Sequence, residues 1–165
     1  MEIEAFRQHA HAMVDWMADY MAGVERFPVR AQTAPGTVAA TVPASPPQGP
    51  ESIAAIMSDF ERDILPGVTH WQHPRFFAYF PANSSPPSVL AEMLTATIGA
   101  QCMLWQTSPA GTELETRVTE WLRQMIGLPE GLHGVIQDSA SSAILCAILT
   151  ARERATGWRV NESGM

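Results

Sequence analysis

The chain has 165 residues, enough for one ordinary domain with a sizeable core, and its net charge is −7 without any basic run. That charge argues against nucleic acid and anionic membranes as partners. Hydrophobic residues make up 46% of the chain and charged residues only 16%, so we expect part of the surface to be covered by another polypeptide.

Two residue types restrict the chemistry further. All 10 basic residues are arginines, so a reaction that needs a lysine amine must take it from elsewhere. Cys102 and Cys146 lie in apolar segments without a C-x-x-C spacing, which predicts buried thiols of a cytosolic protein and no disulfide framework. Neither a signal peptide nor a membrane-length apolar run is visible, which agrees with a cytoplasmic location.

The first segment predicts an amphipathic helix that ends near Gly23. Apolar residues recur at steps of three and four, and Trp16 and Tyr20 widen this face, which therefore needs a partner helix or a partner subunit. His9 and His11 are two positions apart and point away from each other, so they predict no shared metal site. The apolar stripe consists of Ile3, Phe6, Ala10, Met13, Val14, Met17 and Met21.

Residues 27–50 contain six prolines and predict an extended, irregular connector that lies over a surface. A second helix is expected to begin near Glu51, with Ser52 as its cap. The pair Pro66-Gly67 is expected to stop it.

Residues 68–82 are unusually aromatic, with five aromatic side chains within ten positions. Strict alternation fails, so this is not a simple amphipathic strand. The density fits plain core and an aromatic pocket wall, anchored by Pro74 and Pro81, equally well. His70 and His73 could bind a metal, but no third ligand pattern accompanies them, so we predict no metal site.

Two further helices are predicted to start with the pair Ser-Pro, at residues 85–86 and 108–109. A capping serine followed by a proline in the first turn is a good helix start. The first helix runs toward Gly99, and the second ends at Gly127. The glutamates of the second helix fit the first turn and the solvated face of that helix. We therefore assign no catalytic role to Glu113, Glu115 and Glu120.

Residues 134–154 combine a short apolar run, a polar turn and a helix. The first four residues are expected to enter the protein interior, and apolar residues on all sides from Ala143 onward predict a buried helix. In the turn, either Asp138 or Ser139 simply caps the helix, or the segment Ser139-Ala140-Ser141 binds an anion such as phosphate. Taken alone, the cap is the simpler interpretation.

Four blocks carry a resemblance that spans nearly the whole chain. They are F-R-x-x-x-x-x-M-V-D-W-x-A-D-Y at residues 6–20, P-G-V-T-H-W-Q-H-P-R-F-F-A-Y-F-P at 66–81, T-S-P-A-G-T-E-L-E at 107–115 and G-V-I-Q-D-S-A-S-S-A at 134–143. In this order they resemble the N-terminal part of aromatic L-amino-acid decarboxylases. This pyridoxal-phosphate-dependent group includes the dopa, tryptophan, tyrosine and histidine decarboxylases.

The resemblance implies an α/β fold, the fold type I of pyridoxal-phosphate enzymes, in which N-terminal helices precede a large domain with a seven-stranded sheet. This chain itself is expected to be mostly helical. Residues 1–84 would form a helical and extended segment swapped onto the partner subunit of an obligate homodimer. Residues 85–165 would form the incomplete first part of the cofactor-binding domain.

The resemblance also implies which residues touch ligands. Ser139, Ala140 and Ser141 would hold the phosphate of pyridoxal 5'-phosphate. The amino-acid substrate would be lined by Trp71, Tyr79, Phe80, Pro81 and Ala82, with Gln101 and Met103 reaching the pocket from the neighbouring subunit.

Three positions depart from the family pattern. Ala82 stands where animal dopa decarboxylases have a threonine, and Gln101 and Met103 replace apolar and aromatic residues, so the resemblance implies an aromatic amino acid without specifying which one. The family's catalytic histidine, aspartate, lysine and tyrosine would all follow residue 165. We therefore expect no catalytic residue here and the C-terminal remainder as a separate chain. The alternatives are an aldehyde-forming decarboxylase–oxidase of the same fold and a non-catalytic helical assembly fragment.

Overall fold

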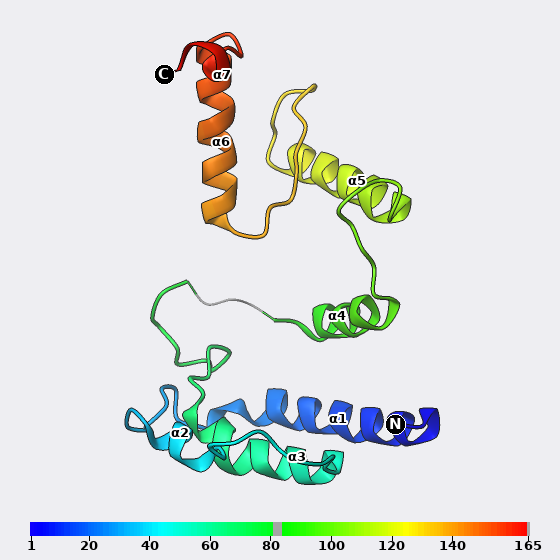
Figure 1. Ribbon diagram of the computed structural model, residues 1–165, viewed down its shortest axis with the longest axis vertical. Coiled ribbons are helices and arrows are strands. Elements are labelled where there is room, and N and C mark those ends of the chain that lie inside the picture. Colours follow the sequence, from blue (N-terminus) through cyan, green and yellow to red (C-terminus); the bar gives the residue numbers. More distant parts are fainter. Residues whose placement is uncertain (81–83, 165) are drawn as a thin grey trace. The chain divides into compact units, whose positions relative to one another are not determined.

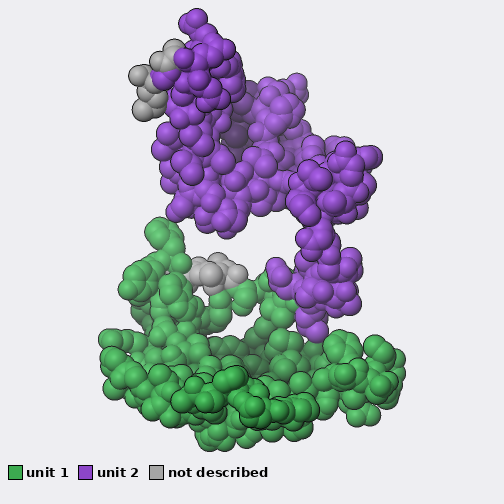
Figure 2. Space-filling view, in the orientation of Figure 1, with its two compact units in different colours: residues 1–89 green, residues 90–165 purple. Residues whose placement is uncertain are grey.

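The computed structural model describes residues 1–80 and 84–164, and helices are the regular elements of this part of the chain, without a strand (Figure 1). The chain divides into two compact units, residues 1–89 and residues 90–165 (Figure 2). Each unit is described by itself below. Within the described residues, no helix is both long and apolar enough to cross a membrane.

In the first unit, α1 (Ile3–Gly23) is the predicted amphipathic helix, and a short 3-10 helix, η1 (Val24–Arg26), continues it. The Trp16 and Tyr20 rings stack with their centroids 5.5 Å apart. Trp16 also meets Phe60 edge-on at 5.5 Å, which joins α1 to the second helical segment. The widened aromatic side of the helix is therefore the side that packs within this unit, because aromatic rings bring the largest apolar area.

The connector at residues 27–50 is irregular as predicted, except for α2 (Thr37–Thr41). The prediction was wrong for these five residues. They contain no proline, and Gly36 before them has φ 88°, a left-handed conformation that glycine adopts without strain and that turns the chain into the helix.

The predicted second helix is α3 (Ile53–Asp59), and Ser52 caps it, since its Oγ accepts the backbone N–H of Ala55 at 3.2 Å. The helix widens into a π-helical turn, η2 (Phe60–Ile64), and tightens into a 3-10 turn, η3 (Leu65–Gly67). The stop at Pro66-Gly67 is confirmed. The change in helical pitch was not predicted, because side-chain periodicity does not specify it.

The helix α4 (Pro86–Ile98) begins in the first unit and ends in the second, and α5 (Pro109–Met125) lies wholly in the second. Both serine caps are confirmed. Ser85 Oγ accepts from the backbone N–H of Ser88 at 3.4 Å, and Ser108 Oγ accepts from that of Gly111 at 3.2 Å. These hydroxyls satisfy N–H groups that the first turn of a helix leaves without an acceptor.

The last helices are α6 (Ala140–Ala155) and α7 (Val160–Ser163). Three burial predictions were wrong here. Residues 134–136 are exposed and do not enter an interior, α6 exposes apolar side chains all along its length, and both cysteines are exposed. The physical reason is common to all three, because an apolar pattern shows that a face is to be covered, and no second layer covers it within the described residues.

Candidate cofactor and substrate site

The polar turn before α6 is a helix cap. Ser139 has an extended backbone, and its Oγ accepts the backbone N–H of Ser142 at 3.3 Å. The two hydroxyl oxygens of these serines also lie 3.2 Å apart. The capping interpretation is therefore confirmed for Ser139, and Asp138 is not the cap.

The cap leaves donors for a further ligand. Ala140 and Ser141 are the first two residues of α6, so their backbone N–H groups have no acceptor inside the helix. Both residues are exposed, and within the described chain the Ser141 hydroxyl makes no hydrogen bond. Two N–H groups and a hydroxyl at the positive end of a 16-residue helix match the needs of a phosphate.

The aromatic segment forms an exposed stack. Trp71 stacks on Phe76 with ring centroids 4.8 Å apart and on Tyr79 at 5.7 Å. Trp71 is 42% exposed, Tyr79 85% and Phe80 98%, so these three side chains are not core in this unit. Tyr79 has φ 55°, a left-handed conformation that a non-glycine residue rarely adopts. The predicted site residues Pro81 and Ala82 lie outside the described residues.

Two histidines of the same segment are buried, at 2% exposure for His70 and 3% for His73. The Tyr20 hydroxyl lies 2.7 Å from His70 Nδ1, and burial raises the pKa of Tyr20. Burial, and secondly the charge of His73, lower the pKa of His70, which favours its neutral imidazole. Sequence reasoning considered these histidines only as metal ligands, and Tyr20, 50 positions away from His70, only as part of a helix face.

Among the described residues, no group of three or more histidine, cysteine, aspartate or glutamate side chains gathers closely enough to hold a metal ion. His73 Nδ1 instead accepts the backbone N–H of Arg75 at 3.0 Å.

Gln101 and Met103 lie in the loop between α4 and α5, in the second unit. Thr107 Oγ1 donates to the carbonyl of Gln101 at 2.7 Å, which closes this loop, and the Met103 side chain is exposed. Trp71 and Tyr79 belong to the first unit. Of the predicted substrate residues, the structure brings the rings of Trp71 and Tyr79 into contact, and Gln101 and Met103 belong to the other unit.

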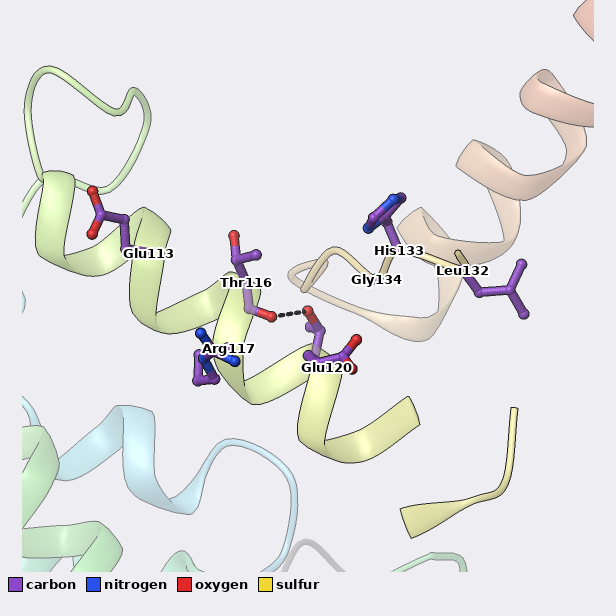
Figure 3. A pocket seen from close by; sticks show the side chains of 8 residues that line it. Glu113, Thr116, Arg117, Glu120, Leu132, His133 and Gly134 are labelled. Atoms are coloured by element: carbon purple, nitrogen blue, oxygen red, sulfur yellow. Dashed lines mark hydrogen bonds between the residues drawn. The ribbon is translucent and has the colours of Figure 1, made fainter. Parts of the chain in front are cut away.

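A groove of about 400 Å³ lies between α5 and the loop at residues 132–134 (Figure 3). Its acids already have partners. Glu120 accepts hydrogen bonds from Arg123, at 2.6 and 2.9 Å, and from Gln124, and these bonds lower its pKa to about 2. Glu113 accepts from Trp105 Nε1 at 3.1 Å. We assign the groove no reaction, and the side chains drawn in Figure 3 include Glu113, Thr116, Arg117, Glu120, Leu132 and His133.

Comparison with known proteins identifies the family. Residues 35–165 match the family described as pyridoxal-dependent decarboxylase conserved domain. The chain belongs to this family. It is 43% identical over 160 residues to tyrosine decarboxylase 1 of Narcissus pseudonarcissus, covering 93% of this chain and 31% of that protein. It is 46% identical over 162 residues to the mouse aromatic-L-amino-acid decarboxylase, covering 93% and 34%.

Solved structures agree with this membership. The crystal structure of Catharanthus roseus tryptophan decarboxylase in complex with L-tryptophan superposes with a TM-score of 0.91 at 42% identity, covering 100% of this chain and 35% of that one. Rice TDC with PLP and tryptamine gives a TM-score of 0.90 at 32% identity, covering 99% and 35%. The resemblance drawn from the four blocks is confirmed. The chain spans about a third of the length of the relatives it matches.

Proposed function

We propose that this chain is the N-terminal part of a pyridoxal-phosphate-dependent decarboxylase that converts an aromatic L-amino acid to its amine and CO2. The observation that carries the proposal is the family match over residues 35–165, together with decarboxylases of tyrosine, tryptophan and aromatic amino acids among the relatives. The family's cofactor is pyridoxal 5'-phosphate.

The start of α6 fits the phosphate of this cofactor. In our proposal Ser139, Ala140 and Ser141 hold it, through the two N–H groups without an intrahelical acceptor and the Ser141 hydroxyl. This serine turn would bind only the phosphate, so other residues must bind the cofactor's ring. When bound, the cofactor supplies an electron sink for the electron pair that the departing CO2 leaves behind.

The exposed aromatic stack is proposed to be the substrate wall, formed by Trp71, Tyr79 and Phe80 with Pro81 and Ala82. Apolar walls remove water from the substrate, and this favours the loss of the localised carboxylate charge. Aromatic rings also offer faces on which an aromatic substrate side chain stacks. Gln101 and Met103 would complete the pocket from a second copy of the chain.

The partners follow from the chemistry that these residues lack. The chain has no lysine amine, and we propose that the part of the enzyme that these residues do not span supplies the groups that act on the cofactor. We further propose a homodimer of fold type I, with residues 1–84 swapped onto the partner subunit and residues 85–165 opening the cofactor domain. The exposed apolar side chains of α1 and α6 support this proposal, because a partner subunit would cover them. A cytoplasmic location is proposed as well, supported by two free cysteines.

A second candidate is an aldehyde-forming enzyme of the same family. The chain is 45% identical to the phenylacetaldehyde synthase of Arabidopsis thaliana over 160 residues, covering 93% of this chain and 33% of that protein. An enzyme of this kind would release an aldehyde, ammonia and CO2 instead of an amine and CO2, with O2 accepting the two electrons to give hydrogen peroxide.

Mass and terminal-sequence analysis of the protein purified from its source tests the proposal first. We expect lysine-containing sequence in addition to these 165 residues, together with pyridoxal absorbance. Product analysis with tryptophan, tyrosine, phenylalanine and dopa then separates the two reactions, because only the second forms an aldehyde. A lone chain that binds no cofactor when pyridoxal phosphate is added would contradict both candidates and favour a non-catalytic assembly fragment.

A further inference from the structure

The two buried histidines lie on either side of the residue that carries the proposed substrate wall. His70 precedes Trp71 directly and His73 follows it by two positions, and both imidazoles are almost fully buried while the indole is 42% exposed. A buried imidazole costs free energy unless its nitrogens are hydrogen-bonded. The partners of these two side chains therefore determine how the segment around Trp71 is held.

His70 is held by contacts with three residues of the unit. Its Nδ1 lies 2.7 Å from the hydroxyl of Tyr20 on α1. Its ring stacks on Phe27 with centroids 4.6 Å apart. Its backbone N–H donates to the carbonyl of Val29 at 3.0 Å. Of these contacts, the hydrogen bond with the Tyr20 hydroxyl is the one that links the His70 imidazole to α1.

His73 closes a tight turn around Trp71. Its backbone N–H donates to the carbonyl of His70 at 3.0 Å, and its Nδ1 accepts the backbone N–H of Arg75 at 3.0 Å. The backbone N–H of Phe76 donates to the carbonyl of His73 at 2.9 Å. Because this turn starts at His70, any shift of His70 passes to Trp71 and to Phe76, the ring on which Trp71 stacks.

We propose that Tyr20 and His70 are positioning residues for the aromatic wall. The Tyr20 hydroxyl holds His70, and His70 holds the Trp71 ring where it receives the side chain of an aromatic amino-acid substrate. This inference rests on the proposed function, because Trp71 touches the substrate while Tyr20 and His70 do not. Through the bond between Tyr20 and His70, α1 would control substrate affinity, although α1 contributes no residue to the aromatic wall.

The variant Tyr20→Phe tests the link with the smallest possible change. It keeps the ring that stacks on Trp16 and makes a tilted contact with Phe27, and it removes only the hydroxyl. In the decarboxylase that contains this chain, we expect KM for the aromatic substrate to rise about tenfold, the effect of one buried hydrogen bond, with kcat changed less than about twofold. Misfolding is checked by helical circular dichroism.

A matched control breaks another contact of α1. Glu61 accepts a hydrogen bond from Trp16 Nε1, four residues before Tyr20 on the same helix, and has no hydrogen bond to His70. Glu61→Ala therefore loosens α1 at Trp16, whose ring stacks on Tyr20, but keeps the hydrogen bond between Tyr20 and His70, and we expect it to leave KM unchanged. His70→Asn keeps a hydrogen-bonding group near the position of Nδ1 and should retain more substrate affinity than His70→Phe.

A second readout works on the same decarboxylase and does not depend on turnover. With fluorinated tryptophan, the ¹⁹F resonance of Trp71 is assigned by its loss in Trp71→Phe. We expect Tyr20→Phe to shift this resonance and Glu61→Ala to leave it in place. Unchanged KM and an unchanged Trp71 resonance in Tyr20→Phe would overturn the inference.

The two hypotheses fail in different ways. If Trp71→Ala does not raise KM, Trp71 is not part of the substrate wall and that part of the proposed function fails. If Trp71→Ala raises KM while Tyr20→Phe changes neither KM nor the resonance, the proposed function stands and only the positioning role is wrong. If no decarboxylation occurs, the resonance alone decides whether Tyr20 holds Trp71.

Discussion

Glu115 Oε1 accepts the backbone N–H of Ile136 at 2.7 Å, across 21 positions of the sequence. This bond ties the loop that leads to α6 onto α5. It thereby joins the third and the fourth of the sequence blocks, since residues 107–115 end at Glu115 and residues 134–143 contain the proposed phosphate turn. A glutamate that the helix pattern places on a solvated face thus holds the loop that leads to the proposed phosphate turn.

Replacing Glu115 with alanine should free the Ile136 amide, because no other acceptor takes its place. We expect faster hydrogen exchange at Ile136 and a loss of about 1 kcal/mol in the stability of the second unit. Amide exchange followed by NMR measures both. Glu113→Ala serves as the control, since it removes only the acceptor of Trp105 Nε1. Equal exchange at Ile136 in both variants would contradict the role of Glu115.

Two serines of the α6 turn should differ in their effects. Ser141→Ala should weaken retention of pyridoxal phosphate in the assembled enzyme by roughly 1.5–3 kcal/mol, the contribution of a charged hydrogen bond, and leave the melting temperature nearly unchanged. Ser139→Ala should also lower stability by about 1 kcal/mol, because it removes the cap. Equilibrium dialysis and thermal unfolding separate the two. Undiminished cofactor affinity in Ser141→Ala would remove this residue from the phosphate site.

Acid should destabilise the first unit through His70. Burial holds the pKa of His70 below that of the unfolded chain, and the charge of His73 adds to this effect. The folded state therefore binds fewer protons, so its stability is complete above about pH 6.5 and decreases as the pH falls below that value. Urea unfolding between pH 7.5 and 5 measures the slope. His70→Asn should flatten it, and an unchanged slope would rule out His70 as the titrating group.

Gly134 should tolerate no side chain. A Cβ atom there would lie 2.8 Å from Cβ of Thr119 and 3.2 Å from its Cγ2, so Gly134→Ala must push the loop away from α5. We expect a loss of roughly 1–3 kcal/mol, measured by urea unfolding. Gly49→Ala is the control, because nothing lies within 4 Å of its Cβ position. Equal stability of the two variants would show that the loop yields without cost.

The sequence alone predicted where most helices begin and end. Ser52, Ser108 and Ser139 cap the helices that follow them, and such caps act on backbone groups within three residues. A feature with so short a range is readable from the local sequence. The proposed phosphate turn was predicted for the same reason, since its donors would be the first residues of one helix.

Only the tertiary structure decided which apolar and aromatic groups are covered. Cys146 and the apolar side chains of α6 were expected to be buried and are exposed, because periodicity specifies a face and not what packs against it. The reverse holds for His70 and His73, polar residues that are the most buried of the aromatic segment. The bond from Tyr20 to His70 spans 50 positions. No local pattern encodes a contact at that separation, because the fold of the intervening chain brings the two side chains together.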